Sequence, residues 1–262
     1  MKLTTWRQLS DGGPDLVPCL DFSGGRSVAG FPDLAAAVPV DVSFLHNERA
    51  SVGPLSVCLD RWVAELTATR RPVRAVLGFC SGCALATRVA DAIAASPAAT
   101  GPAPRVVLFD AVPTTGDSLA GQLPSALEPS ARHLTADELA DARDLAEQLA
   151  ATYPDDLPLI AATLSDRYDR LMRAVADRLS LHEFAFRELT DGFTAYLDYL
   201  VLTSEGGFDM RSTTPLFVCS NGYEPPVENA RTITLDINHA DLLRAPEAHK
   251  LVADLLTGEH PW

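Results

Sequence analysis

The sequence predicts an α/β protein with a mostly parallel central sheet and helices on both faces. Two observations predict it: short apolar runs alternate with helical stretches over residues 16–109, and the alternation returns from residue 215 onward. Parallel strands form near-continuous apolar runs because both faces of their sheet are covered. Residues 129–204 hold helical patterns alone. We therefore expect a core of residues 1–128 and 205–262, with a helical lid at 129–204 inserted between two strands.

Strands are predicted where residues are continuously apolar or alternate between apolar and polar. The run at 73–79 is almost entirely apolar, and the run at 16–22 ends in a Ser-Gly-Gly turn. The expected strands are 16–22, 38–45, 73–79, 105–109, 215–219 and 231–237, with an additional edge strand at 2–10.

Helices are predicted by apolar residues at helical spacing. In the core they are expected at 55–67, 81–95 and 246–256, and in the lid at 155–179 and 181–202. Pro246 stands where a first-turn proline is tolerated, and Gly258 where a helix can stop. A further lid helix begins with a capping box formed by Thr135 and Glu138.

The charge and cysteine content exclude several classes of protein. Lysine and arginine number 21 against 35 acidic residues, a net charge of −14, which argues against a binder of nucleic acid. No apolar run approaches the roughly 20 residues that span a bilayer, and the N-terminus lacks the apolar stretch of a signal peptide. Five scattered cysteines do not suggest a disulfide framework. We expect a cytoplasmic protein that binds neither nucleic acid nor membrane.

The sharpest functional motif is Gly78-Phe79-Cys80-Ser81-Gly82. It follows an apolar strand and precedes a helix, which is the context of a nucleophile elbow, with cysteine where serine is more common. The Ser81 amide is expected to donate to an oxyanion, and the helix N-terminus to favour a thiolate on Cys80. The alternative is a buried structural cysteine in a chance motif.

Two other interpretations compete for this stretch. Cys80 and Cys83 form a C-x-x-C pair, as in thiol oxidoreductases, but such motifs usually occur in smaller domains. A zinc site would need a second pair of ligands, which is missing at metal spacing, so we expect no metal. Ser81 could also be the nucleophile, although it falls one residue past the apex of the elbow.

The expected base is His239, which follows the last predicted strand and precedes the final helix. The orienting carboxylate has two candidates. Asp110 ends the strand 105–109, and Glu224 follows the strand 215–219. We favour Asp110 because its side chain is shorter than that of Glu224 and lies at the end of a clear strand. The alternative is that Asp110 only caps a turn. Gly24 and Gly25 offer amides for the other side of an oxyanion hole, although glycines also simply make tight turns.

These residues carry a family resemblance. The chain resembles the α/β-hydrolase thioesterases that release chains from polyketide synthases and non-ribosomal peptide synthetases. The similarity covers the glycine turn region (18–34), the strand, elbow and Ala-rich helix (59–90), and the last two strands with an H-x-x-L-L segment (214–256). The resemblance implies an α/β-hydrolase fold, the nucleophile at Cys80, the base at His239 and the acid at Asp110. It also implies an acyl or peptidyl carrier protein as partner and a substrate on its phosphopantetheine arm, with no other cofactor.

Two departures from the family pattern affect the expected reaction. Free-standing proofreading members tend to hold an aspartate after the later strand, where this chain has Glu224, so product release is favoured over editing. The cysteine nucleophile would exchange one thioester for another and keep the acyl group activated. We therefore expect release of the chain by an internal amine or hydroxyl, or by water.

Two alternatives to this function stay open. Dienelactone hydrolases also use a G-x-C-x-G elbow and act on small soluble lactones, but they lack a long helical lid between the late strands. A protein of hydrolase fold that only binds its ligand, with a vestigial Cys80, is the alternative outside the enzymes. Four arginines of the lid could dock an acidic carrier or simply pair with neighbouring aspartates; they are Arg167, Arg170, Arg173 and Arg178.

Overall fold

A computed structural model describes residues 3–22, 28–47, 53–180 and 182–259. The chain divides into two compact units, one formed by residues 1–113 and 205–262 and the other by residues 114–204. The helical unit begins at Thr114, ahead of the expected position 129. The short helices α4 (Gly116–Ala120) and α5 (Gln122–Leu127) belong to it because they pack on α6 (Ala136–Thr152) and α7 (Leu157–Leu179).

The first unit is built on a seven-stranded sheet in the order β1-β3-β2-β4-β5-β6-β7. Every neighbouring pair is parallel except β1 and β3, so the predicted edge strand exists but is antiparallel and short. The strands are β1 (Trp6–Gln8), β2 (Asp15–Leu20), β3 (Val42–Asn47), β4 (Ala75–Phe79), β5 (Arg105–Phe109), β6 (Leu216–Cys219) and β7 (Arg231–Thr234). The predicted parallel sheet is confirmed.

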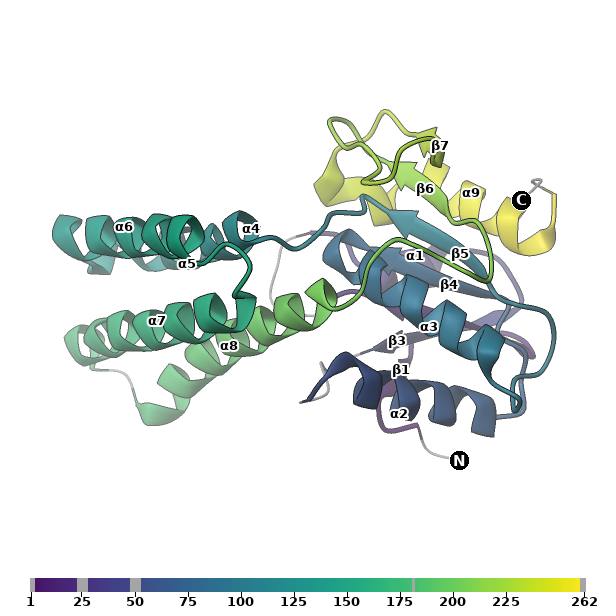
Figure 1. Ribbon diagram of the computed structural model, residues 1–262, viewed down its shortest axis with the longest axis horizontal. Coiled ribbons are helices and arrows are strands. Elements are labelled where there is room, and N and C mark those ends of the chain that lie inside the picture. The colour runs from purple at the N-terminus through teal and green to yellow at the C-terminus, as the bar shows by residue number, and fades with distance from the viewer. Residues whose placement is uncertain (1–2, 23–27, 48–52, 181, 260–262) are drawn as a thin grey trace. The chain divides into compact units, whose positions relative to one another are not determined.

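Helices cover both faces of this sheet, as predicted. On one face, α2 (Leu55–Ala68) packs against α3 (Cys83–Ala95), which lies across β4 and β5 in front of the sheet in Figure 1. On the other face, α1 (Phe31–Ala37), the 3-10 helix η3 (His239–Arg244) and α9 (Pro246–Thr257) share one apolar core with alternate strand residues. Burial of these apolar surfaces is the main force holding the layers together.

The structure differs from the predicted elements at two places near the N-terminus. Helix α1 was not predicted, because its seven residues are too few to show a helical period. Strand β3 starts at Val42 rather than at residue 38, because Val38 ends α1 and Val40 lies in the turn that follows.

The second unit, in its described part, is made of helices joined by short turns. Its long members are α6 (Ala136–Thr152), α7 (Leu157–Leu179) and α8 (Glu183–Ser204), with the 3-10 helix η2 (Glu128–His133) before α6. Helices α6 and α8 both pack on α7, and the three run side by side in Figure 1. The predicted capping box is confirmed, since the Thr135 hydroxyl accepts from the Glu138 amide and the Glu138 carboxylate accepts from the Thr135 amide.

Candidate active site

Cys80 lies at the sharp turn where β4 ends and the helical segment of η1 (Cys80–Gly82) and α3 begins. Its φ of +54° is a conformation that residues other than glycine rarely adopt, and such strain clusters at functional sites. Gly78 lets the helix pass close to the strand, because a Cβ there would lie 2.6 Å from the Cys83 Cα atom. The backbone thus has the form of a nucleophile elbow, as the motif predicted.

The position of Cys80 suits a reactive thiol. Its side chain is half-buried, while Ser81 and Cys83 beside it are buried. The thiol stands at the N-terminal end of consecutive helical turns, where the helix dipole favours negative charge. Ser81 follows the apex directly, so its amide is the donor expected on that side of an oxyanion.

The strand register brings the elbow and the predicted acid to one edge of the sheet. Phe79 is paired with Phe109 across β4 and β5, so the next residues, Cys80 and Asp110, leave neighbouring strands at the same level. Asp110 also has a positive φ, of +44°, and its side chain is fully buried. Both residues stand at the carboxyl ends of parallel strands, where ligands of open α/β sheets bind.

His239 begins η3 and is bonded to Asp110, with 2.7 Å between its Nδ1 atom and Oδ2 of the carboxylate. An ionised carboxylate can only accept, so Nδ1 carries the proton of a neutral imidazole and Nε2 remains able to take another. The histidine side chain is 27% exposed while the aspartate is buried. This arrangement is that of a base oriented by a carboxylate.

Ser220, which the sequence reasoning missed, completes the environment of Asp110. Its amide N–H donates to Oδ1 at 2.7 Å and its hydroxyl donates to Oδ2 at 2.6 Å. A buried carboxylate is costly unless its oxygens are bonded, and Ser220 supplies these bonds. A polar residue directly after β6, at the edge where β5 and β6 are paired, was the signal that could have revealed it.

Glu224, the other candidate acid, lies on the surface. Its side chain is exposed and makes no hydrogen bond or ion pair within the described part of the chain. The carboxylate that the structure brings to His239 is therefore Asp110. Gly24 and Gly25, the predicted oxyanion glycines, lie outside the described residues.

The other cysteines are buried, and burial raises the pKa of three of their thiols. Burial holds the pKa of Cys19 well above the ordinary value, and the nearby Asp21 adds to the effect. Burial does the same to the pKa of Cys83, where Cys80 and Asp110 add to the effect. Burial, with Asp110 and Glu224, raises the pKa of Cys219 to about 11. These three thiols stay protonated near neutrality, which makes them poor candidates for a nucleophile.

His46 is bonded elsewhere and is not an alternative base. It is 1% exposed and its Nε2 atom is hydrogen-bonded to the Asp21 carboxylate. No cluster of three or more metal-ligating side chains that could hold an ion was found in the ranges that the structure describes.

Three of the four lid arginines are paired with acids of the helical unit. Arg178 donates two hydrogen bonds to the Glu138 carboxylate, Arg167 lies 3.7 Å from Asp141, and Arg173 lies 3.8 Å from Glu183. Arg178 lowers the pKa of Glu138 to about 2, together with the Thr135 amide.

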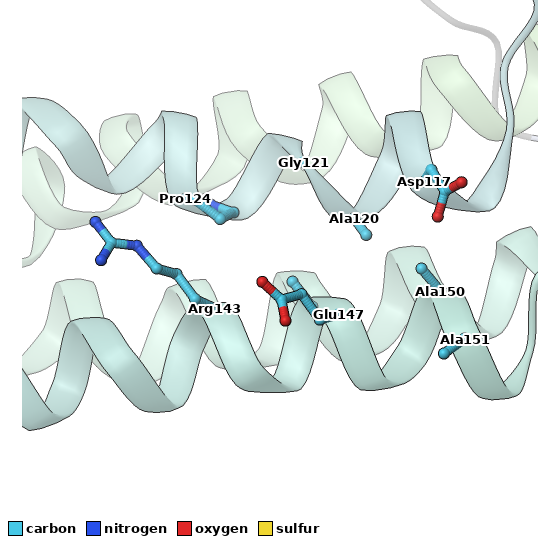
Figure 2. A pocket seen from close by; sticks show the side chains of 9 residues that line it. Asp117, Ala120, Gly121, Pro124, Arg143, Glu147, Ala150 and Ala151 are labelled. Carbon is cyan, nitrogen blue, oxygen red and sulfur yellow. The ribbon is translucent and has the colours of Figure 1, made fainter.

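A pocket of about 500 Å³ lies within the helical unit, between α4, α5 and α6 (Figure 2). The small alanine side chains of α6 do not fill this space, and the side chains of Asp117, Arg143 and Glu147 border it. None of its lining residues is a cysteine, serine or histidine.

Comparison with known proteins identifies the fold. No family model and no curated protein sequence matches the chain. Among solved structures, a four-domain non-ribosomal peptide synthetase bound to AMP and glycine, holo-AB3403, matches 99% of this chain with a TM-score of 0.57 and 14% identity. The chain spans 20% of the length of that synthetase.

Two further structures match over nearly their whole length. The Vlm2 thioesterase domain bound with a dodecadepsipeptide has a TM-score of 0.51 and 15% identity, with 97% of each chain covered. The non-heme bromoperoxidase BpoC of Mycobacterium tuberculosis H37Rv, itself a putative assignment, has a TM-score of 0.51 and 14% identity, over 99% of this chain and 98% of its own. The protein has the α/β-hydrolase fold. At these identities the likeness establishes the fold, and the chemistry has to be argued from the residues.

Proposed function

We propose that this protein is a thioesterase of natural-product biosynthesis that takes an acyl chain from a carrier-protein thioester onto Cys80. The observation that carries the proposal is a cysteine at a strained elbow, one strand away from a buried aspartate that is bonded to His239. The fold shared with the Vlm2 thioesterase domain, whose structure holds a dodecadepsipeptide, supports this choice of substrate class.

The first half of the reaction loads the enzyme. Nε2 of His239 takes the thiol proton of Cys80, and the thiolate attacks the carbonyl carbon of the acyl pantetheine thioester. The tetrahedral oxyanion is stabilised by the Ser81 amide and by an amide of Gly24 or Gly25. The carbon–sulfur bond to pantetheine then breaks, and the departing thiolate takes the proton from the imidazolium of His239. The product is an acyl thioester on Cys80.

The second half releases the chain. An amine or hydroxyl of the acyl chain, or a water molecule, gives its proton to His239 and attacks the same carbon. The bond to the Cys80 sulfur breaks, which restores the thiolate. Because the acyl group remains a thioester throughout, its activation is available for closing a ring.

The remaining parts of the proposal concern partners and setting. The carrier protein supplies the phosphopantetheine arm, and the helical unit, which is inserted between β5 and β6, serves as a lid. We propose a cytoplasmic location, which is supported by the absence of a disulfide among the described residues, all five cysteines included. None of the helices that the structure describes is long and apolar enough to cross a membrane.

The test is acylation followed by mass spectrometry of the intact protein. Incubation with an acyl pantetheine thioester should add one acyl mass to the wild type and none to Cys80→Ala. Ser81→Ala keeps the backbone amide and serves as the matched control, so it should still be acylated. An unchanged mass gain in Cys80→Ala would refute the nucleophile, and loss of the gain in Ser81→Ala alone would assign that role to the serine. Turnover of small soluble lactones without acylation by pantetheine thioesters would favour a dienelactone-hydrolase activity.

A further inference from the structure

The imidazole of His239 is stacked against two aromatic rings. The Phe79 ring lies with its centroid 4.9 Å from that of the imidazole, at an interplanar angle of 17°. The Tyr223 ring lies 4.8 Å away at 15°. Phe79 belongs to the elbow itself, whereas Tyr223 comes from the loop after β6, so it is an independent contribution to the site.

Backbone hydrogen bonds define the turn after β6 that carries Tyr223. The Tyr223 amide donates to the Ser220 carbonyl at 3.2 Å, and Gly222 between them has a φ of +81°, which glycine adopts at little cost. Asn221 donates its amide N–H to the Ile237 carbonyl at 2.9 Å. The same short turn therefore presents Ser220 to Asp110 and Tyr223 to His239.

A stacked aromatic ring distinguishes between the two protonation states of an imidazole. The face of the ring carries negative charge density, so it attracts a cation more strongly than a neutral group. The contact with Tyr223 therefore stabilises imidazolium relative to imidazole. In a cysteine–histidine pair the imidazolium forms when the thiol proton moves to Nε2, so what favours the imidazolium also favours the thiolate.

We infer that Tyr223 is a positioning residue whose ring, stacked on His239, favours the imidazolium and thereby the thiolate of Cys80. This inference rests on the proposed roles of Cys80 and His239. It assigns the effect to the ring rather than to the phenol hydroxyl. The hydroxyl stays protonated near neutrality, because burial, with Cys80 and Asp110 nearby, raises the pKa of Tyr223.

Other charged groups lie on the elements next to His239, and a substitution at Tyr223 alters none of them. Asp110 binds Nδ1, while Asp241 and Arg244 of η3 are paired with each other at 3.6 Å. The other titratable groups on these elements include Cys80 on η1, Glu224 and Glu228 on the loop after β6, Asp236 on the loop before η3, Asp33 on α1, and Glu247, His249, Lys250 and Asp254 on α9.

The experiment measures alkylation of Cys80 by iodoacetamide as a function of pH, with the modified residue located by mass spectrometry. In Tyr223→Leu, we expect the alkylation rate at about pH 6 to fall roughly tenfold, with the difference vanishing at about pH 9, where the thiol ionises unaided. Tyr223→Phe keeps the ring and should stay within about twofold of the wild type at every pH. Tyr153→Leu, which changes a 46% exposed tyrosine of the helical unit, is the matched control and should behave as the wild type.

Each other outcome overturns a specific part of the argument. Equal rates for Tyr223→Leu and the wild type at about pH 6 would refute the role of the ring while leaving Cys80 as nucleophile. An equal loss in Tyr223→Phe would assign the effect to the hydroxyl, and a loss of constant size at all pH values would indicate a distorted loop. A wild-type thiol that is inert at about pH 6 would refute the proposed function along with the inference. Tyr223→Gln replaces the leucine variant if the latter does not fold.

Discussion

Replacement of Asp110 by asparagine tests the proposed acid with almost no change in side-chain size. The Ser220 amide N–H donates to Oδ1 at 2.7 Å, so an oxygen must remain at that place. The new NH2 group is thereby directed to the place of Oδ2, which lies 2.7 Å from Nδ1 of His239. The Ser220 hydroxyl, which donates to Oδ2 in the wild type, can turn and accept from this NH2 group, whereas the backbone N–H can only donate. An NH2 group donates, so Nδ1 must accept and the ring proton moves to Nε2.

The consequence is a base in the wrong tautomer. A neutral imidazole protonated at Nε2 cannot take a proton from Cys80 or from the attacking group in the release step. The corresponding exchange in a serine protease lowers kcat about 10⁴-fold, and we expect a loss of about 10³–10⁴-fold for Asp110→Asn. The assay is turnover of an acyl pantetheine thioester near neutral pH, with the urea midpoint of each variant recorded to separate activity from stability.

Glu224→Gln is the matched control for this experiment. Its side chain is exposed and is not bonded to His239, so kcat should change by no more than about twofold. If Asp110→Asn kept kcat within tenfold of the wild type while Glu224→Gln lost it, the assignment of the acid would be reversed. If both variants kept it, the reasoning that a carboxylate selects the tautomer of His239 would fail.

Two further predictions concern stability. Gly78→Ala places a Cβ 2.6 Å from the Cys83 Cα atom and should lower the free energy of unfolding, measured by urea titration, by about 1–3 kcal/mol. Gly192→Ala is the control: its Cβ would meet no atom within 4 Å, so the change should raise the free energy of unfolding by up to about 1 kcal/mol. Glu138→Gln removes the charge that Arg178 stabilises and should lower the free energy of unfolding by about 0.5 kcal/mol, a small loss because both groups are partly exposed. This loss should be present above about pH 4.5 and vanish as the pH falls towards about 2, where Glu138 of the wild type is protonated as well. A cost that persisted at low pH would contradict the second prediction.

Much of the fold could be predicted from local patterns. Buried parallel strands need continuous apolar runs, and the strands that end at Phe79 and Phe109 were found in this way. The capping box at Thr135 is a contact between neighbours in sequence, so three residues were enough to predict it. Elements too short to show a period, such as α1, were missed.

The candidate site also combines a local feature, which the sequence could predict, with non-local contacts, which it could not. The elbow at Cys80 is local, because a strand, a glycine and a helix that follow one another determine its geometry, and the sequence could predict it. The partners of Asp110 and His239 are not local: Ser220 and Tyr223 reach them only because β5 and β6 are paired in the sheet.

The sequence by itself determined an α/β sheet, a strained cysteine turn and two acids that could each serve His239. Only the tertiary structure showed which of those acids is bonded to the imidazole, since Asp110 is buried beside His239 and Glu224 is exposed. The physical reason is that a hydrogen bond needs its two atoms within about 3 Å of each other, and for residues far apart in the chain that distance depends on strand order and register.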